Sequence, residues 1–317
     1  MSSSQRLKFP KDNKQFFSTL MKRVNSYFEE NNISKHANGW MFLKSLSILT
    51  MIISAYYAVV FGGFYNNTPL MLGLWAVLGF VSALAPVNIG HDAIHGGYSS
   101  KNWVNNLMSN AFNFFGASAY MWSIMHNQAH HMYTNIDGHD EDMETLPIIR
   151  FSPTQKYMGI HKFQHIYAFF FYGLASITWV LFKDYKKFFS SHIGSIKNNH
   201  STKEYFNLFF YKAIYYTIFI VVPFTVIPLP WYAILGGWIL MHYVEGLTIA
   251  LIFMLAHLVE KAQFPNPVDA KGNMQNSWAI HQMMTTADFA RDSWLAFFIC
   301  GGLNFQIEHH LFPKICH

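Results

Sequence analysis

The chain has 317 residues, of which 52% are hydrophobic, 18% aromatic and only 12% charged. Soluble domains usually carry about a quarter charged residues, so this composition excludes an ordinary water-soluble domain and indicates a membrane protein. The net charge of +5 does not indicate nucleic-acid binding, because the basic residues flank apolar stretches instead of forming one basic surface. Two cysteines, Cys300 and Cys316, are too few for a disulfide framework.

Residues 1–39 are polar and basic, and they lack the apolar core and small-residue cleavage site of a signal peptide. We expect them to form a cytosolic N-terminal segment. Residues 40–317 are expected to form one membrane-embedded domain.

Four apolar stretches approach the ~20 residues that a helix needs to cross a bilayer. They cover residues of about 41–62, 69–89, 211–226 and 231–257. The connections GFYNNT and IPLP contain no Lys or Arg, whereas basic residues concentrate in 6–35 and 183–203. The positive-inside rule places those basic regions in the cytosol. We therefore predict an all-α integral membrane protein with four transmembrane helices in two hairpins and both chain ends in the cytosol.

A fifth apolar stretch, at about 166–182, is short for a span and is followed by the basic sequence KDYKK. If it crossed the membrane, the histidine motifs on either side of it would lie on opposite faces. We predict an interfacial or half-inserted helix here.

Histidines gather in three short motifs. HDAIH contains His91 and His95, and HNQAHH contains His126, His130 and His131. On a helix, residues at i and i+4 share one face at a distance that one metal ion can bridge. We therefore expect each i, i+4 pair to act together.

The third motif, QIEHH, contains Gln306, His309 and His310, and His257 lies at the cytosolic end of the last apolar stretch. One i, i+4 histidine pair is a weak signal by itself. Three motifs at the same predicted membrane face indicate a metal site, since imidazole is the commonest metal ligand in proteins.

The number of candidate ligands distinguishes between metals. Eight histidines exceed the three or four protein ligands of a zinc site. They suit two six-coordinate irons with open positions for water or O2. A membrane metal transporter is the alternative from a different class, but its ligands would lie near the bilayer centre. Here the motifs lie at helix ends, which favours oxygen chemistry.

Together, HDAIH, HNQAHH and QIEHH resemble the three histidine boxes of the membrane fatty acid desaturases. The flanking sequences HHMYTNIDGHDED and GGLNFQIEHHLFPKICH resemble the same family, and the similarity runs from about residue 40 to the end. Gln306 in the third box resembles the front-end desaturases, which insert a double bond between an existing one and the carboxyl end. A lipid or carotenoid hydroxylase of the same superfamily is the alternative enzyme.

The resemblance implies a cytosolic helical cap that holds a di-iron site above four transmembrane helices. It implies a reaction in which O2 and a fatty acyl chain, carried on CoA or a lipid, yield a cis double bond. No HPGG haem motif occurs, so electrons are expected from a separate carrier of the cytochrome b5 or ferredoxin type. The implied location is a bacterial inner membrane or the endoplasmic reticulum. The implied iron ligands are His91, His95, His126, His130, His131, His257, His309 and His310, with Gln306 bound directly or through water.

Other polar residues have supporting roles in this interpretation. Asp92 and Glu308 are expected to orient ligand imidazoles, and adjacent His130 and His131 to serve different irons. The acidic loop GHDEDME is expected to be solvated.

His242 and Glu245 fall inside the last apolar stretch, where ionisable residues pair or line a cavity. They pair with each other or lie near the closed end of an acyl tunnel, with an influence on chain length or double-bond position.

Overall fold

The computed structural model describes residues 6–317, so the first five residues of the N-terminal segment lie outside it. Helices dominate the described chain, and β1 (His192–Ile193) and β2 (Ile196–Lys197) form one small antiparallel pair. The α-helices are α1 (Phe16–Glu30), α2 (Gly39–Phe61), α3 (Thr68–Ala85), α4 (His91–Ile94), α5 (Asn102–Phe114), α6 (Ala119–Ser123), α7 (His131–Tyr133), α8 (Gln164–Gly173), α9 (Ala175–Thr178), α10 (Asp184–Phe188), α11 (Thr202–Tyr216), α12 (Val222–Val226), α13 (Trp231–His257), α14 (Trp278–Thr285), α15 (Trp294–Cys300) and α16 (Gln306–Leu311). The π-helices are η1 (Pro86–Gly90), η2 (Ile124–His130), η5 (Trp179–Lys183) and η6 (Thr217–Val221), and the 3₁₀-helices are η3 (Glu141–Met143) and η4 (Gly159–Phe163).

Four helices in residues 6–317 are long and apolar enough to cross a membrane, which confirms the predicted number. They are Gly39–Phe61, Thr68–Ile94, Thr202–Val226 and Trp231–His257. The second is longer than expected because η1 continues it into α4, and the third because α11 begins at Thr202, before the apolar stretch. Helices of 27 residues measure about 40 Å, so they extend beyond a hydrocarbon layer of about 30 Å.

The spans pack around α3, which contacts both α2 and α13. In the most apolar window of the span Thr68–Ile94, which contains α3, 61% of the residues are buried. In the corresponding window of Thr202–Val226, 22% are buried. Gly79 permits this contact, since a Cβ there would lie 2.1 Å from the carbonyl oxygen of Met241. Small residues allow transmembrane helices to approach closely.

The fifth apolar stretch forms a bent helix in two parts, Gly159–Gly173 and Ala175–Phe188, with a 55° bend between them. It crosses α13 where Gly246 and Gly173 meet, since a Cβ on Gly246 would lie 2.6 Å from the Gly173 carbonyl oxygen. The bend therefore lies against the middle of the last span.

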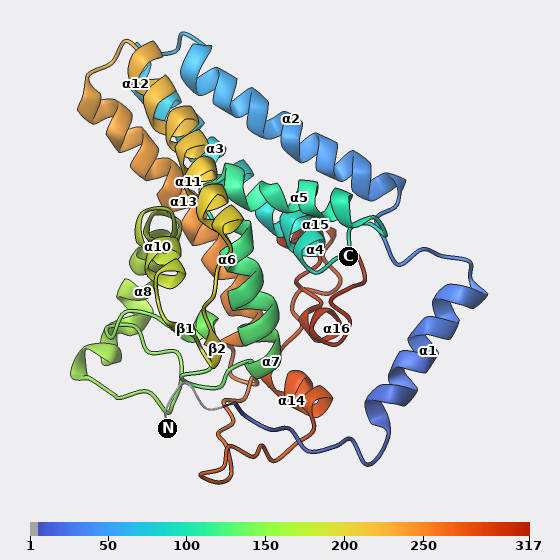
Figure 1. Cartoon of the computed structure of the whole chain (residues 1–317). Helices are drawn as coiled ribbons and strands as arrows, with labels where there is room; N and C mark the ends of the chain where they lie inside the picture. The colour runs from blue at the N-terminus through green and yellow to red at the C-terminus, as the bar shows by residue number, and fades with distance from the viewer. Residues whose placement is uncertain (1–5) are drawn as a thin grey trace.

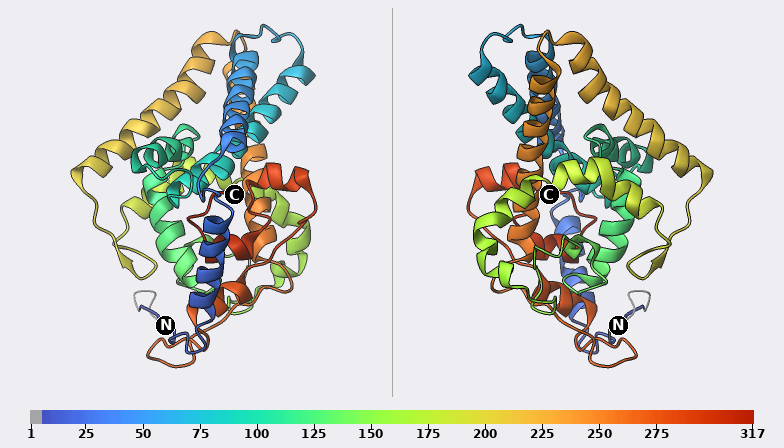
Figure 2. Two further views of the ribbon diagram at one scale, coloured as in Figure 1. Left: turned by 90° about the vertical axis from the view of Figure 1, so that its right-hand side faces the viewer. Right: turned by 90° about the vertical axis from the view of Figure 1, so that its left-hand side faces the viewer.

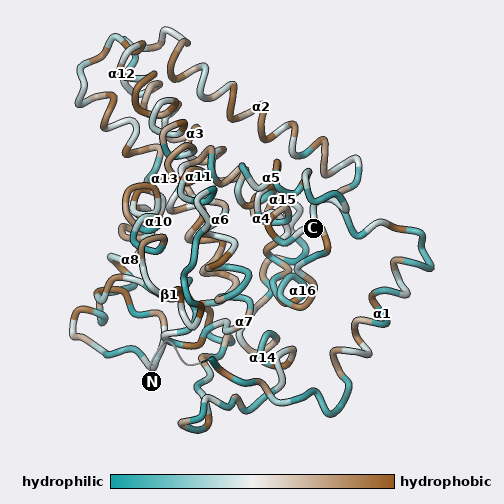
Figure 3. Tube along the Cα trace, viewed as in Figure 1, coloured by the Kyte–Doolittle hydropathy of each residue, from teal (hydrophilic) through white to brown (hydrophobic). Residues whose placement is uncertain are grey.

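The spans extend to one end of the molecule, and the shorter helices gather at the other end (Figures 1 and 2). The spans are mostly hydrophobic, whereas the loops at the opposite end are mostly hydrophilic (Figure 3). One hydrophobic core includes residues of η1, which precedes the first histidine motif, and another includes residues of η2, which contains most of the second. The histidine motifs thus lie where the two halves join.

Candidate metal centre

The first motif directly follows a π-helical turn at the end of the second span. η1 (Pro86–Gly90) leads into α4, which contains His91, and His95 caps its end. The two rings lie 4.8 Å apart, as the i, i+4 spacing predicts. Both histidines are buried.

The second motif lies in a π-helix, which changes the expected pairing. A π-helix repeats every i+5, so His126 and His131 meet, with their Nε2 atoms 3.2 Å apart. The rings of His126 and His130 stack 5.1 Å apart. The i, i+5 contact of His126 with His131 is thus added to the expected i, i+4 pair, and His126, His130 and Asp142 also lie close enough together to hold one ion.

The third motif, on α16, inserts between the other two. His309 Nε2 lies 3.1 Å from His131 Nε2. The ring of His310 lies 5.1 Å from that of His130 and 4.8 Å from that of His257, the last residue of α13. Two neighbouring histidines of one short helix thus face different partners.

These contacts divide the histidines into two clusters whose ligand atoms lie within 4.8 Å of one another. His131 adjoins the first cluster, since its Nε2 contacts both His126 and His309. Seven of the eight histidines are buried, and His309 is partly exposed. The first cluster is His91, His95, His126 and His309, and the second is His130, His257 and His310.

The geometry fits bound cations. In the first cluster the Nε2 atoms face one another in pairs at 3.1–3.2 Å. Two nitrogens at about 2.1 Å from one metal, at right angles, would lie about 3 Å apart. Buried polar atoms without a hydrogen-bond partner include His95 Nε2, His130 Nε2 and His310 Nε2. Buried polar atoms normally have partners, so these nitrogens are suited to an ion.

Hydrogen bonds at Nδ1 leave Nε2 free in His130 and His310 of the second cluster. His130 Nδ1 lies 2.9 Å and 3.0 Å from the two carboxylate oxygens of Asp140. His310 Nδ1 donates to Gln282 Oε1 at 2.7 Å, and His257 Nδ1 faces the Thr285 carbonyl at 3.3 Å. Such acceptors select the tautomer that offers Nε2 to a metal.

Burial and neighbouring imidazoles lower the pKa of His126, His131, His309 and His310 well below the ordinary value. These rings are neutral at pH 7 and offer lone pairs. Burial also acts to lower the pKa of His130, but the charge and hydrogen bonds of Asp140 outweigh it, and the pKa is raised.

The acidic loop is not the solvated face that the sequence suggested. Asp140 is 4% exposed and accepts hydrogen bonds from His130 and from the backbone of Asn135. Asp142 lies 3.3 Å from His126 Nδ1. The expectation failed because hydrophilicity alone does not show that a carboxylate faces water when buried imidazoles can donate to it. Asp140, Asp142 and Gln282 were missed, although the position of HDED just after HNQAHH was an available signal.

Three other predicted residues lie in different surroundings. Gln306 is fully buried, and its Nε2 lies 2.9 Å from His257 Nε2. Asp92 is buried beside His91, with Oδ1 3.8 Å from Nδ1. The Glu308 side chain is 51% exposed and lies 3.6 Å from Arg291, so it faces away from the imidazoles.

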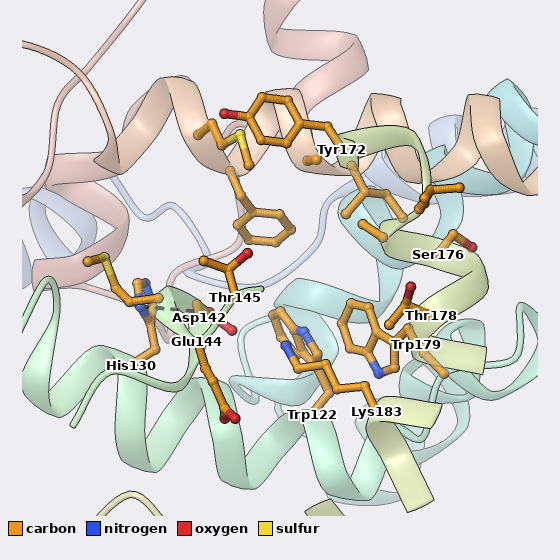
Figure 4. A pocket seen from close by; sticks show the side chains of 18 of the residues that line it. Trp122, His130, Asp142, Glu144, Thr145, Tyr172, Ser176, Thr178, Trp179 and Lys183 are labelled. Atoms are coloured by element: carbon orange, nitrogen blue, oxygen red, sulfur yellow. Dashed lines mark ion pairs between the residues drawn. The ribbon is translucent and has the colours of Figure 1, made fainter. Parts of the chain in front are cut away.

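A cavity of about 510 Å³ adjoins the clusters. His91, His130 and His257 are among its lining residues, as are Ser176 and Glu245. His130 and Ser176 lie at different parts of the cavity wall (Figure 4). The rest of the wall is mostly apolar and includes Phe112, Phe115 and Trp122. On α13, one face lines the cavity from Glu245 to His257, a length of about 18 Å. The size is within the range of cavities that bind small molecules.

His242 and Glu245 belong to a buried polar cluster. Ser176 Oγ lies 2.8 Å from both His242 Nδ1 and Glu245 Oε2, and the two side chains approach to 3.0 Å. Tyr215 bonds to His242 Nε2, and Trp238 donates to the Tyr215 hydroxyl at 3.1 Å. Both earlier interpretations have support, since the pair contact each other and Glu245 lines the cavity.

Comparisons with known proteins agree with this geometry. The sequence profile of the family described as fatty acid desaturase matches residues 67–317. An sn-1 linoleoyl-lipid 6-desaturase of Arthrospira platensis is 37% identical over 309 residues, covering 95% of this chain and 81% of the relative. An acyl-lipid (8-3)-desaturase of Physcomitrium patens is 34% identical and covers 96% of this chain and 64% of the relative. A second sn-1 linoleoyl-lipid 6-desaturase, from Synechocystis sp., is 33% identical and covers 100% and 88%. The chain belongs to the fatty acid desaturase family.

Proposed function

We propose that this enzyme uses O2 to insert a cis double bond into the acyl chain of a membrane lipid, on the carboxyl side of an existing double bond. The observation that carries the proposal is the position of both histidine clusters beside one apolar cavity. The relatives named as acyl-lipid desaturases favour a lipid-linked substrate over acyl-CoA.

Two irons are the metals that suit these ligands. The first would be held by His91, His95, His126 and His309 with His131, and the second by His130, His257 and His310. Gln306 would complete the second site directly or through a water molecule. The irons would supply the O2 chemistry that removes hydrogen from unactivated methylene groups, which side chains alone cannot do.

The residues of the chain position the substrate and the ligands. Asp140 and Gln282 hold the rings of His130 and His310 with Nε2 toward the metal. The apolar wall, including Trp122 and Phe253, excludes water and holds the acyl chain straight between the clusters and Glu245. Glu245 and Ser176 would limit the inner end of the cavity and influence chain length or double-bond position.

The proposed topology places residues 40–317 as one desaturase domain, with both chain ends and the histidine clusters in the cytosol. The uncharged connections 62–67 and 227–230 support a location on the other side of the membrane. The bent helix 159–188 would lie along the cytosolic interface, where exposed Phe169, Phe170 and Phe182 contact lipid. This arrangement suits a bacterial inner membrane or the endoplasmic reticulum.

The electron balance requires a partner. Reduction of O2 to two waters takes four electrons, and formation of one double bond supplies two of them. The other two would come from a separate one-electron carrier of the cytochrome b5 or ferredoxin type.

Expression in a host that lacks polyunsaturated lipids, fed with linoleate, tests the proposal. Mass spectrometry of the lipids should show a new double bond on the carboxyl side, and His130→Ala should abolish it. A hydroxylated product would instead support the related hydroxylases. An unchanged lipid profile with a functional electron carrier present would refute the proposal.

A further inference from the structure

A second polar cluster lies behind His91, on the side away from the acyl cavity. It contains Lys44 of α2, Asp92 of α4, and Cys316 and His317, which follow α16. Cys316 N donates to the Lys35 carbonyl at 2.9 Å, so the end of the segment is attached to the region before α2. Parts of the chain more than 200 residues apart therefore meet at one carboxylate.

The two oxygens of Asp92 face different groups. Oδ2 accepts three hydrogen bonds, from His317 Nδ1 at 2.7 Å, His317 N at 3.2 Å and Cys316 Sγ at 3.1 Å. Oδ1 lies 3.8 Å from His91 Nδ1, which is longer than a hydrogen bond, and that nitrogen has no hydrogen-bond partner among the described residues. Asp92 is thus held on one side and free to accept from His91 on the other.

Lys44 determines the tautomer of His317. Its ammonium group lies 3.0 Å from His317 Nε2 and can only donate, so Nε2 accepts and the proton is on Nδ1. That proton points at Asp92. Burial and the nearby carboxylate raise the pKa of the Cys316 thiol, which therefore stays protonated and donates as well.

We propose that Cys316 and His317 are positioning residues that hold Asp92 so that it fixes the tautomer and orientation of His91. The inference rests on the proposed function, in which His91 binds metal through Nε2. A carboxylate that accepts from Nδ1 keeps the ring oriented, and such partners are commonly worth 10–100-fold in metal affinity. A series of contacts from Lys44 through His317 and Asp92 to His91 therefore connects α2 to the metal centre.

Asp92, Cys316 and His317 also lie close enough together to be ligands of a further metal ion. The ammonium of Lys44 at 3.0 Å from the His317 ring disfavours a cation there. Both His317 nitrogens already have partners, whereas His95, His130 and His310 each have an Nε2 without one. The hydrogen-bonded arrangement gives both His317 nitrogens and the Cys316 thiol a partner.

Anaerobic titration of the metal-free, full-length protein with Co2+ tests the inference, with the visible absorption bands and a competing chelator as readouts. His317→Leu should weaken one of the two Co2+ sites by about 10-fold or more and change its absorption bands. His317→Asn should restore near-normal binding, because its amide N–H occupies the position of Nδ1–H. His165→Leu, a change at an exposed histidine, serves as the matched control and should have no effect.

A double variant separates this effect from a general loss of stability. Asp92→Asn should weaken the same site, and Asp92→Asn with His317→Leu should be no worse than Asp92→Asn alone.

If His317→Leu binds two Co2+ ions as the unmodified protein does, the inference is wrong while the proposed function stands. If the unmodified protein binds no Co2+, both are wrong. If it binds three ions and His317→Leu binds two, the cluster is a metal site and the positioning role is refuted.

Discussion

The metal centre and the buried network of Ser176, His242 and Glu245 differ in whether their polar atoms have hydrogen-bond partners. Near the metal centre, several ring nitrogens face one another without hydrogen-bond partners, as at His95, His130 and His310. Near the middle of α13, Ser176 bridges His242 and Glu245 in a connected network. Unsatisfied buried polar atoms are costly, so the metal centre is suited to a ligand, and the network of Ser176, His242 and Glu245 is suited to structural support. The number of histidines alone would not have separated the two.

The largest expected loss of desaturation comes from removing a metal-centre imidazole whose Nε2 has no hydrogen-bond partner. His310→Ala should lower desaturation at least about 100-fold and release one of the two metals, because a direct ligand outweighs its supporting groups. Product analysis and metal content of the purified protein measure the two effects. Retention of both metals in His310→Ala would contradict the assignment.

The next largest effect, on metal affinity, is expected from a change at Asp140. Asp140→Asn leaves His130 without its charged acceptor and should cost about 10–100-fold in metal affinity. Asp137→Asn, in the same loop, is the matched control and should bind metal normally. Equal metal affinity of the two variants would show that Asp140 does not orient His130.

Metal binding should depend on pH through His130. Its pKa is raised, so a proton occupies the ring up to a higher pH than usual, and a metal must displace it. Affinity should therefore increase as the pH rises through this raised pKa and level off above it. The other imidazoles with lowered pKa values do not compete for protons in this range. In Asp140→Asn the midpoint should move to lower pH, and an unchanged midpoint would contradict the pairing.

The smallest effects are expected from changes in the hydrogen-bonded network of Ser176, His242 and Glu245. Ser176→Ala removes two hydrogen bonds and should cost about 1 kcal/mol of stability, with metal content unchanged. Glu245→Gln should change the chain-length range or the double-bond position of the product. A thermal unfolding assay and lipid analysis check the two variants, and an unchanged product from Glu245→Gln would remove Glu245 from the substrate site.

Much of the arrangement could be predicted from local patterns. Long apolar stretches predicted four spans, because a helix must satisfy its own backbone hydrogen bonds in lipid. The motifs around His91, His126 and His309 indicated a metal centre of a known family. The i, i+4 spacing did not reveal the contact between His126 and His131, because it assumes an α-helix and a π-helix has a longer repeat.

Other features could not be predicted, since they depend on contacts between distant segments. Asp140 was expected to be solvated, yet it meets His130 because the acidic loop folds back beneath η2. Gln282 reaches His310 from α14, and His317 reaches Asp92 across more than 200 residues. No local spacing encodes such contacts.

The sequence by itself determined the membrane class, the four apolar spans and the histidine motifs that the structure brings together. These properties follow from hydropathy, charge and residue chemistry, which act over short distances along the chain. Only the tertiary structure decided that His126 contacts His131 and that Asp140 and Gln282 contact the rings of His130 and His310. Those choices depend on a π-helical turn and on packing between segments far apart in sequence, where the burial of each polar group requires a specific partner.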